Sequence, residues 1–536
     1  MKKYRFILFS HLFLLCAFTL SAKTYLINYT DANKINKIAY LDSKLGVISK
    51  QAIVGKVANG EKTLVNTHKN SQYIAVLAKI GENSKYDEVV IFHKQTLQEY
   101  NRIKLPKVRW DVISGLKISP IFISNDDSKL VVISKTKSNL AVKIYAIDGK
   151  EPIYSRNLGK NTYQIFRSDD DNYLLFESLS AHNRLFVAID IQQIKTSSIL
   201  NLGKSQVRTY IFKNTLFISR ERSPRRGKYY TLSKVDISQN KKILFKETSK
   251  SHFVFATDKT KDNLFIAGQN KSKKLFVLHF TDAKNYQKTT FKKKIKPLSI
   301  ILQNWQKLQK ILILGHKKLA TISFAGNKIK QIQNTIKIPF DPLDGILNKT
   351  GTLAYVQENL GSEVAVFDLL KGKLIKSVNA GRVFNHVLLG ARKIMIGGSL
   401  IELIMMTLKS TKNMLLSNKQ DKLFVINATT NDVTIFRANN LEKISALATG
   451  FKTYFIHQGE NPKSPILVVG ENRISLIDND SDNIFLTLKN AELVGLDKDD
   501  DILFYVLDKK VFMYDMRQKK IIKQLKLPTN LTVLTS

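Results

Sequence analysis

Residues 422–447 read KLFVINATTNDVTIFRANNLEKISAL. Two short apolar runs, Leu423–Ile426 and Val433–Phe436, are rich in β-branched and aromatic residues and are separated by a polar Thr/Asn/Asp segment. This pattern is typical of two antiparallel strands joined by a tight connection. A helix would instead repeat its apolar residues every 3.6 positions. The stretch therefore predicts a small β unit.

Similar stretches begin at Lys129, Asp262 and Thr352, and a turn at Asp148-Gly149 follows the first of them. Gly149 is expected there because glycine accepts a positive φ. Most steps between equivalent strands are about 36–48 residues, close to the 40–45 residues of a four-stranded propeller blade. We therefore expect an all-β propeller of about 10 or 11 four-stranded repeats. The equivalent strands begin at Leu130, Leu174, Leu216, Leu264, Ile311, Leu353, Leu423, Ile466 and Ile502, with earlier candidates at Ile38 and Ile74.

These units resemble the YVTN-type (WD40-like) repeats of β-propeller proteins. The resemblance lies in a Leu-Phe-Val strand, a polar turn containing Asn and a second strand, as in 423–427 with 431–436, and in 353–356 with 364–368. It covers about two thirds of the chain after residue 22 and implies the propeller fold. Such propellers serve as lactonases, dehydrogenase subunits, receptors and scaffolds, so the fold does not determine the function.

The number of repeats bears on how the propeller is divided. One closed ring usually has 4–8 blades, so 10 or 11 repeats favour two rings, residues 23–295 and 296–536, over one ring with embellishments. The last strands are expected to pair with an N-terminal strand, because this closes a ring and removes an open sheet edge.

The first 22 residues have the three parts of a secretory signal. Lys2, Lys3 and Arg5 precede an apolar run, Phe6–Leu20, and two small residues follow it. We therefore expect export to the periplasm, the extracellular space or the cell surface; an uncleaved anchor is the alternative. The only cysteine, Cys16, would be removed with the signal, so that the mature protein could form neither a disulfide nor a thiolate metal site.

One step breaks the period, because 70 residues separate Leu353 from Leu423. The extra segment contains a strongly apolar stretch, residues 388–410, that predicts a short helix despite Gly397-Gly398. The helix could be buried in or between rings, or it could contact a partner or lipid. In the second case the contact residues would be Ile394, Met395, Ile396, Leu400, Ile401, Leu403, Ile404 and Met405.

The formal net charge is +41, which favours anionic partners. Lysine is spread over nearly every repeat, which also fits solvated loops, but it clusters in FKKKIK, residues 291–296. Candidate partners are a protein or an acidic envelope polymer, and an anionic membrane surface; no recognised nucleic-acid motif is present. The segment 218–230, ISRERSPRRGKYY, is the best local anion-binding candidate, since arginine forks match phosphate and carboxylate groups. Its arginines are Arg220, Arg222, Arg225 and Arg226.

No sequence motif for catalysis is present. The histidines are scattered without H-x-H or H-E-x-x-H spacing, and there is no nucleophile elbow, Walker loop or dinucleotide fingerprint. The acidic clusters at 169–171 and 497–501 fit polar turns better than calcium loops. We expect no cofactor or metal, and a binding or scaffold protein that contacts proteins or polyanions. The alternative is a lactonase-like hydrolase or a quinoprotein-like oxidoreductase with a metal or cofactor in the channel.

Overall fold

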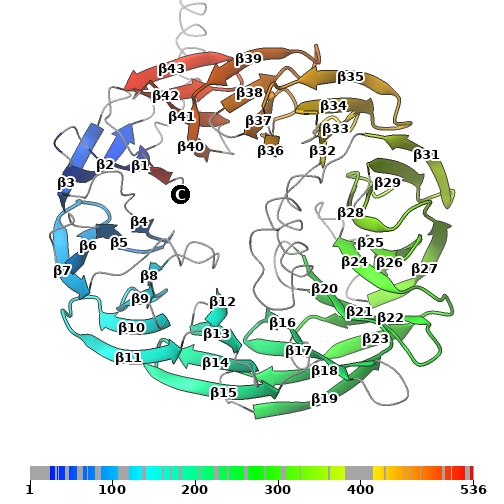
Figure 1. The fold of residues 1–536 in the computed structure, drawn as a ribbon, viewed down its shortest axis with the longest axis horizontal. Coiled ribbons are helices and arrows are strands. Elements are labelled where there is room, and N and C mark those ends of the chain that lie inside the picture. The colour runs from blue at the N-terminus through cyan, green and yellow to red at the C-terminus, as the bar shows by residue number, and fades with distance from the viewer. Residues whose placement is uncertain are drawn as a thin grey trace, which may run out of the picture.

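A computed structural model describes residues 24–534, apart from 43–47, 57–63, 79–85, 107–119, 223–228, 303–309, 381–413, 526–531 and breaks of at most four residues in other loops. The described residues form eleven four-stranded antiparallel sheets. Figure 1 shows these sheets following one another around a single ring. Ten sheets consist of four consecutive strands, and the eleventh combines three N-terminal strands with the last strand of the chain. We number the blades from this composite sheet, blade 1, so that β4 begins blade 2 and β40 begins blade 11.

Each blade has an inner, a second, a third and an outer strand. The inner strands, from blade 1 to blade 11, are β44 (Thr532–Leu534), β4 (Leu64–Asn66), β8 (Ile121–Ile123), β12 (Thr162–Arg167), β16 (Val207–Phe212), β20 (Val254–Thr257), β24 (Pro297–Leu302), β28 (Pro342–Leu347), β32 (Met414–Leu416), β36 (Thr453–Gln458) and β40 (Glu492–Asp497). The second strands are β1 (Thr24–Thr30), β5 (Tyr73–Ala78), β9 (Lys129–Lys135), β13 (Tyr173–Leu179), β17 (Thr215–Arg222), β21 (Leu264–Gln269), β25 (Lys310–Gly315), β29 (Leu353–Glu358), β33 (Lys422–Asn427), β37 (Ile466–Gly470) and β41 (Ile502–Leu507).

The remaining strands lie farther from the channel. The third strands are β2 (Ile35–Asp42), β6 (Tyr86–His93), β10 (Leu140–Ala146), β14 (Arg184–Asp190), β18 (Tyr229–Asp236), β22 (Leu275–Phe280), β26 (Lys318–Ala325), β30 (Glu363–Asp368), β34 (Asp432–Arg437), β38 (Arg473–Ile477) and β42 (Lys510–Asp515). The outer strands are β3 (Ile48–Lys56), β7 (Glu99–Pro106), β11 (Pro152–Gly159), β15 (Lys195–Gly203), β19 (Lys241–Ser249), β23 (Tyr286–Thr290), β27 (Lys328–Lys337), β31 (Lys373–Asn379), β35 (Lys443–Ala448), β39 (Ile484–Lys489) and β43 (Lys520–Leu525).

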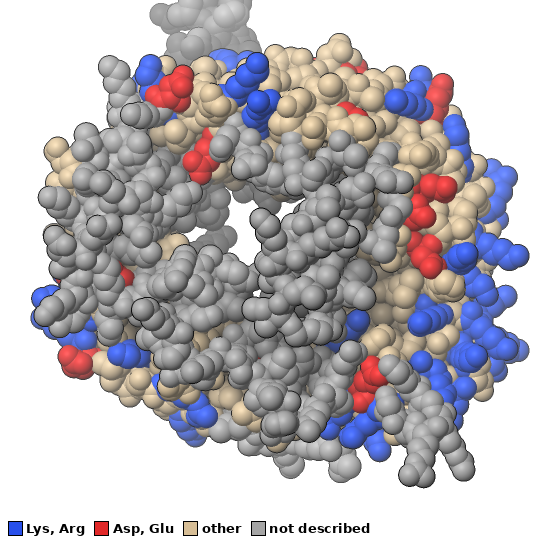
Figure 2. Space-filling view, viewed as in Figure 1, with Lys and Arg blue, Asp and Glu red and all other residues tan. Residues whose placement is uncertain are grey.

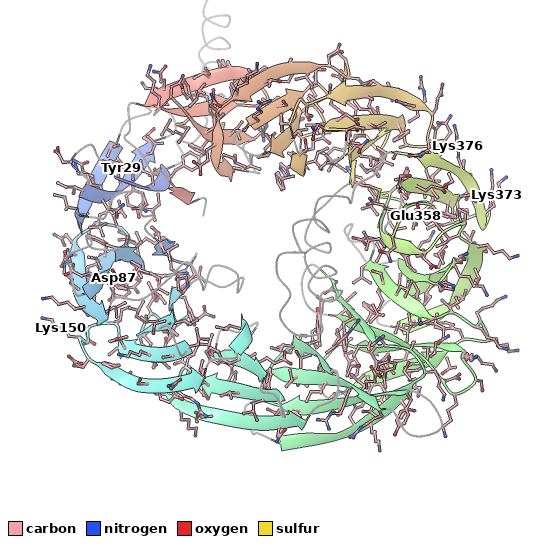
Figure 3. All side chains as sticks on the ribbon, in the orientation of Figure 1. Tyr29, Asp87, Lys150, Glu358, Lys373 and Lys376 are labelled. Atoms are coloured by element: carbon pink, nitrogen blue, oxygen red, sulfur yellow. The ribbon has the colours of Figure 1, made fainter. Side chains whose placement is uncertain are left out.

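The burial of each strand follows from its place in the blade. The second and third strands are covered on both faces by neighbouring blades, so β21 and β22 are buried at every position. The outer strands β23 and β39 alternate between exposed and half-buried residues. Lysines are frequent on the outer edge, where they discourage pairing with another sheet. Figure 3 shows Lys150, Lys373 and Lys376 pointing away from the ring.

The ring is closed by strand pairing between the two ends of the chain. In blade 1, β44 pairs antiparallel with β1, and Leu534 lies opposite Leu26. Tyr25 of β1 also donates a hydrogen bond to Asp497 of blade 11, at 3.0 Å. The sequence prediction that the last strands need an N-terminal strand to close the ring is therefore confirmed.

The strands of every blade run between the two faces of the ring, and these faces carry different connections. We call one face the latch end; it holds the turns from inner to second strand and from third to outer strand. The other, the connection end, holds the turns from second to third strand and the connections between blades. We call the turn between the inner and second strands the inner turn. At the latch end, the inner turn of one blade forms a hydrogen bond with the inner turn of the next blade. Gln72 N donates to Asp127 at 2.7 Å, and Lys349 N donates to Gln420 Oε1 at 2.7 Å.

Sequence expectations about the overall fold are met in part. The all-β propeller and its repeat number are confirmed, with eleven blades. Two separate rings are not seen, and the expected boundary at 295/296 lies inside a shared core. In that core Ile295 packs with Phe265 of blade 6 and Ile311 of blade 7. Blade counts are set by the angle between neighbouring sheets, which the repeat length does not reveal.

Two local expectations need separate comment. The apolar segment 388–410, with Ile394, Met395, Ile396, Leu400, Ile401, Leu403, Ile404 and Met405, lies outside the described residues. Where the chain is described there is no helix, and hence none that could span a membrane. Gly149 does lie in a turn and donates to Ala146 O at 3.0 Å, but its φ is not positive, so its conformational freedom is not what this turn requires.

Candidate anion-binding surface

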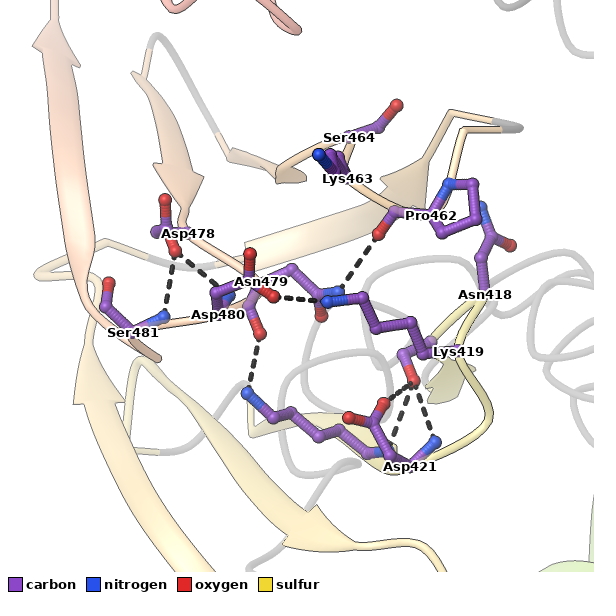
Figure 4. A network of polar contacts seen from close by, with 12 residues as sticks. Asn418, Lys419, Asp421, Pro462, Lys463, Ser464, Asp478, Asn479, Asp480 and Ser481 are labelled. Atoms are coloured by element: carbon purple, nitrogen blue, oxygen red, sulfur yellow. Dashed lines mark hydrogen bonds and ion pairs between the residues drawn. The ribbon is translucent and has the colours of Figure 1, made fainter.

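Several lysines at the latch end hold neighbouring blades together. Lys422 Nζ of blade 9 lies 2.6 Å from Asp482 Oδ1 of blade 10, and both side chains are largely buried. Lys419 pairs with Asp480 in the same network, which Figure 4 shows. Lys310 reaches the Gly351 carbonyl of the next blade at 2.8 Å. Part of the lysine excess is therefore structural.

A second group of lysines gathers at the connection end of blades 6 and 7, where it has no such role. The group occupies the turn between β21 and β22, the connection between β23 and β24, the turn between β25 and β26 with the first residue of β26, and the residue that follows β19. We call these residues the lysine ridge. They are Lys250, Lys271, Lys273, Lys274, Lys292, Lys293, Lys294, Lys296, Lys317 and Lys318.

Backbone hydrogen bonds bring the segments of the lysine ridge together. Lys250 N donates to Gln269 O at 2.8 Å, directly before the first turn. Leu275 N donates to Lys293 O at 2.9 Å, which joins that turn to the next connection. His316 N donates to Lys296 O at 3.3 Å and joins the last turn. The ridge is therefore continuous across the two blades.

Buried anchors fix the middle of the ridge. Phe291 and Ile295 flank three exposed lysines and are buried in the core between blades 6 and 7. Gly315 lies so close that a Cβ there would be 2.7 Å from Lys296 O. The close approach of these two turns therefore requires glycine.

The charges of the lysine ridge are not neutralised by the protein. Eight of the ten side chains are exposed; Lys274 and Lys318 are half-buried. None of the ten forms an ion pair with a carboxylate in the described ranges. A neighbouring acid, Asp341, lies 2.6 Å from His316 Nδ1. Figure 2 shows Lys and Arg gathered at the lower right edge, where Figure 1 places blades 6 and 7.

The predicted arginine cluster is only partly described. Arg220 and Arg222 lie at the end of β17 in blade 5, the first half-buried and the second exposed. Arg225 and Arg226 fall in 223–228, outside the described residues. The sequence singled out 291–296 but missed that lysines at 271–274 and 317–318 adjoin it. Both groups of lysines lie in the turn from second to third strand of adjacent repeats. This shared position in the repeat is the sequence signal that would have predicted their proximity.

A serine, a histidine and an aspartate, the residue types of a hydrolase triad, lie close together, but their hydrogen bonds are not those of a catalytic triad. His68 Nε2 lies 3.3 Å from Asp127 Oδ1, and Ser71 Oγ donates to the same carboxylate oxygen. A serine nucleophile needs the histidine as its own hydrogen-bond partner. These residues instead form part of the latch between blades 2 and 3.

The described residues contain no cluster of three or more potential metal ligands. In the acidic segment 497–501, Asp497 accepts from Tyr25, and Asp501 Oδ2 lies 2.7 Å from Arg517 Nε. Asp501 is in a turn with a positive φ of 57°. These contacts fit the polar turn that the sequence suggested. The other acidic segment, 169–171, lies outside the described residues.

Comparisons with known proteins add no function. No protein-family model and no curated protein matches the chain. Among solved structures, apo AztD from Citrobacter koseri is 10% identical with a TM-score of 0.34, covering 79% of this chain and 95% of that one. Dihydro-heme d1 dehydrogenase NirN in complex with DHE is 11% identical with a TM-score of 0.34, covering 80% and 81%. Hsv2p of Kluyveromyces lactis is 12% identical with a TM-score of 0.31, covering 61% and 98%. These scores are too low to carry an argument, so what is established is the eleven-bladed β-propeller itself.

Proposed function

We propose that this protein is an exported, non-catalytic binding protein that holds an acidic polymer on the lysine ridge. The observation that carries the proposal is ten lysines in four adjoining segments of blades 6 and 7, with no carboxylate paired to any of them in the described structure. Like charges held together on fixed turns repel one another. An anionic polymer relieves that repulsion and releases bound counterions.

The shape of the ridge supports a polymer rather than a single small anion. The lysines lie in separate segments of two neighbouring blades, and each is a flexible point charge. Such a surface contacts many charges of a chain weakly. Affinity should therefore be strong at low salt and should fall as salt screens the charges.

The direct test measures binding of long-chain polyphosphate at low ionic strength to three proteins. These are the wild type, the ridge variant Lys292→Gln/Lys293→Gln/Lys294→Gln and a control, Lys371→Gln/Lys373→Gln/Lys376→Gln. The control removes the same charge from exposed lysines of blade 8. The ridge variant should bind about tenfold more weakly or worse, while the control stays close to wild type. Equal weakening of both variants would mean that only net charge matters, and no binding by the wild type would refute the function.

Export is tested separately. The charged start and apolar run of residues 1–22 support cleavage near Ala22. N-terminal sequencing of the protein recovered from cells should find a mature chain that starts close to Lys23. A chain that still begins with Met1 would refute cleavage.

A further inference from the structure

Arg220 and Arg222 lie on the same face of β17. Side chains two residues apart on a strand share a face. Leu216 and Ile218 of this strand pack against Tyr173 of blade 4. The two arginines continue that row, so they lie at the edge of the interface between blades 4 and 5. They are at the connection end, as is the lysine ridge of the next two blades.

Arg220 differs from other half-buried arginines of the protein in lacking a partner. Its Nε is shut off from solvent and has no hydrogen-bond partner in the described part of the chain. Arg102, by contrast, donates to Glu88 at 2.6 Å and to the Val54 carbonyl at 2.9 Å. A buried donor without an acceptor loses its hydrogen bonds to water and gains none in return. The protein therefore retains Arg220 at a cost to stability.

The electrostatic surroundings of Arg220 favour an added anion. Burial, and after it the positive charge of Arg222, lower the pKa of Arg220. A carboxylate partner would act in the opposite direction. The acid at the same interface is Glu177 of blade 4, which accepts a hydrogen bond from Thr209 Oγ1 at 3.3 Å. Arg220 forms no ion pair with it in the described structure.

We propose that Arg220 and Arg222 bind one tetrahedral oxyanion, a phosphate or sulfate group, at the edge between blades 4 and 5. A guanidinium donates through a planar fork, and a tetrahedral group has enough oxygens to accept from two forks at once. Adjacent residues of one strand face are about 6.6 Å apart, at 3.3 Å per residue, which is within the span of two arginines on one group. Supplying the acceptor that Arg220 Nε lacks requires the side chain to turn toward the anion, because that atom is buried in the structure described. This inference does not rest on the proposed function, because the site takes a single oxyanion whether or not a polymer occupies the lysine ridge.

The experiment measures thermal unfolding in inorganic phosphate, sulfate or acetate, each compared with chloride at the same ionic strength. The wild type should be stabilised by phosphate or sulfate, because the anion binds the folded state alone. Whichever of the two raises the midpoint at the lower concentration identifies the group. Acetate stabilising equally well would overturn the preference for a tetrahedral group.

Variants separate recognition from general charge. Without added oxyanion, Arg220→Met should be at least as stable as wild type, because the unsatisfied donor is gone; with phosphate or sulfate it should gain nothing. Arg220→Lys keeps the charge but loses the fork, so its apparent affinity should fall about tenfold. The control Arg437→Met removes an exposed arginine that pairs with Glu442, and it should respond as wild type does.

The outcomes distinguish this site from the lysine ridge. A response to phosphate or sulfate that survives in both Arg220 variants would overturn the site. So would the absence of any response in the wild type. The ridge variant should keep the small-anion response while losing polyphosphate, and Arg220→Met should do the reverse at low salt. Loss of polymer binding therefore tests the ridge, and loss of the small-anion response tests Arg220.

Discussion

Lys234 is a charged residue enclosed by aromatic rings. It lies on β18 with 1% of its surface exposed. Its Nζ is 4.8 Å from the ring centre of Phe245, 5.2 Å from Phe280 and 5.8 Å from Tyr286. Two of these rings belong to blade 6, so the lysine joins blades 5 and 6. Burial lowers the pKa of Lys234, with Asp282 opposing the shift.

The first prediction separates the charge of Lys234 from its packing. Lys234→Ala removes the long side chain and leaves a cavity, so it should cost about 2–4 kcal/mol of unfolding free energy. Lys234→Met fills most of the space and contacts the same rings through sulfur, so it should cost about 1 kcal/mol or less. Urea unfolding of both variants measures this. A methionine variant as unstable as the alanine variant would show that the ammonium, not packing, holds the blades.

Buried tyrosines predict a loss of stability at alkaline pH. Burial first, and then Glu151, raises the pKa of Tyr145 to about 12; burial, Tyr505 and Asp515 raise the pKa of Tyr514 to about 12. In the unfolded chain tyrosine titrates near pH 10. The folded state therefore keeps protons that the unfolded state loses, and this stabilisation is complete below pH 10 and lost as pH rises to about 12.

The measurement is the unfolding free energy in urea between pH 9 and pH 12, followed with tyrosinate absorbance. Stability should decrease steadily above pH 10. Tyr145→Phe should show a smaller decrease in stability than wild type, because it lacks one of the hydroxyl groups whose deprotonation favours unfolding. Stability that stays constant across this range would contradict the burial of these hydroxyl groups.

At the scale of elements, the inner turns carry both the local geometry and the contact between blades. Asp127, Gln420 and Asp501 have φ of 56°, 64° and 57°, and each accepts a hydrogen bond from the preceding blade. Asp and Asn tolerate this left-handed conformation better than most residues. The turns between inner and second strands therefore combine a left-handed residue with a hydrogen bond to the preceding blade.

Asp127 provides the test of this latch. Asp127→Ala removes the acceptor for Gln72 N and Ser71 Oγ and should cost about 2–4 kcal/mol of unfolding free energy. The control is Asp508→Ala, since Asp508 has a φ of 49° but is exposed in the turn after β41. It should cost about 1 kcal/mol, the cost of the backbone conformation alone. Equal costs in denaturant unfolding would show that the latch contributes nothing.

The sequence predicted the strands better than the contacts between them. The two apolar runs expected to be strands, Leu423–Ile426 and Val433–Phe436, correspond to β33 and β34. The alternation of apolar residues reports which positions are buried, because burial is what it reflects. It does not report that Asp127 accepts from Gln72, because a turn acceptor looks the same whether it bonds within its own turn or to the next blade.

At the scale of the whole molecule, closure depends on three residues of β44. Their pairing with β1 joins the last blade to the first. Deleting residues 526–536 removes the strand that links blade 11 to blade 1 and leaves the inner edge of β1 unpaired, so that packing such as that of Tyr25 on Phe504 alone holds the two blades together. The shortened protein should unfold at a lower temperature and be cut faster by protease near its ends. An unchanged midpoint and unchanged proteolysis would contradict closure by β44.

The candidate site was recognisable in the sequence only in pieces. The run Lys292–Lys296 was visible as a cluster, and Arg220 and Arg222 were visible as anion-binding types. The sequence alone does not distinguish the latch lysine Lys422 from the unpaired Lys293, because both lie next to an apolar strand. The two lysines differ in the face of the ring on which they lie, and that face is known only once the order of the strands in each blade is known. The ring number was missed because the repeat length is the same in one ring or two.

The most direct test of the account is the salt dependence of polyphosphate binding by the wild type and by Lys292→Gln/Lys293→Gln/Lys294→Gln. The logarithm of the wild-type affinity should fall linearly with the logarithm of salt concentration. The slope of the ridge variant should be smaller by about three, roughly one for each lysine removed from contact with the polymer. Identical slopes in the two proteins would contradict binding on the lysine ridge.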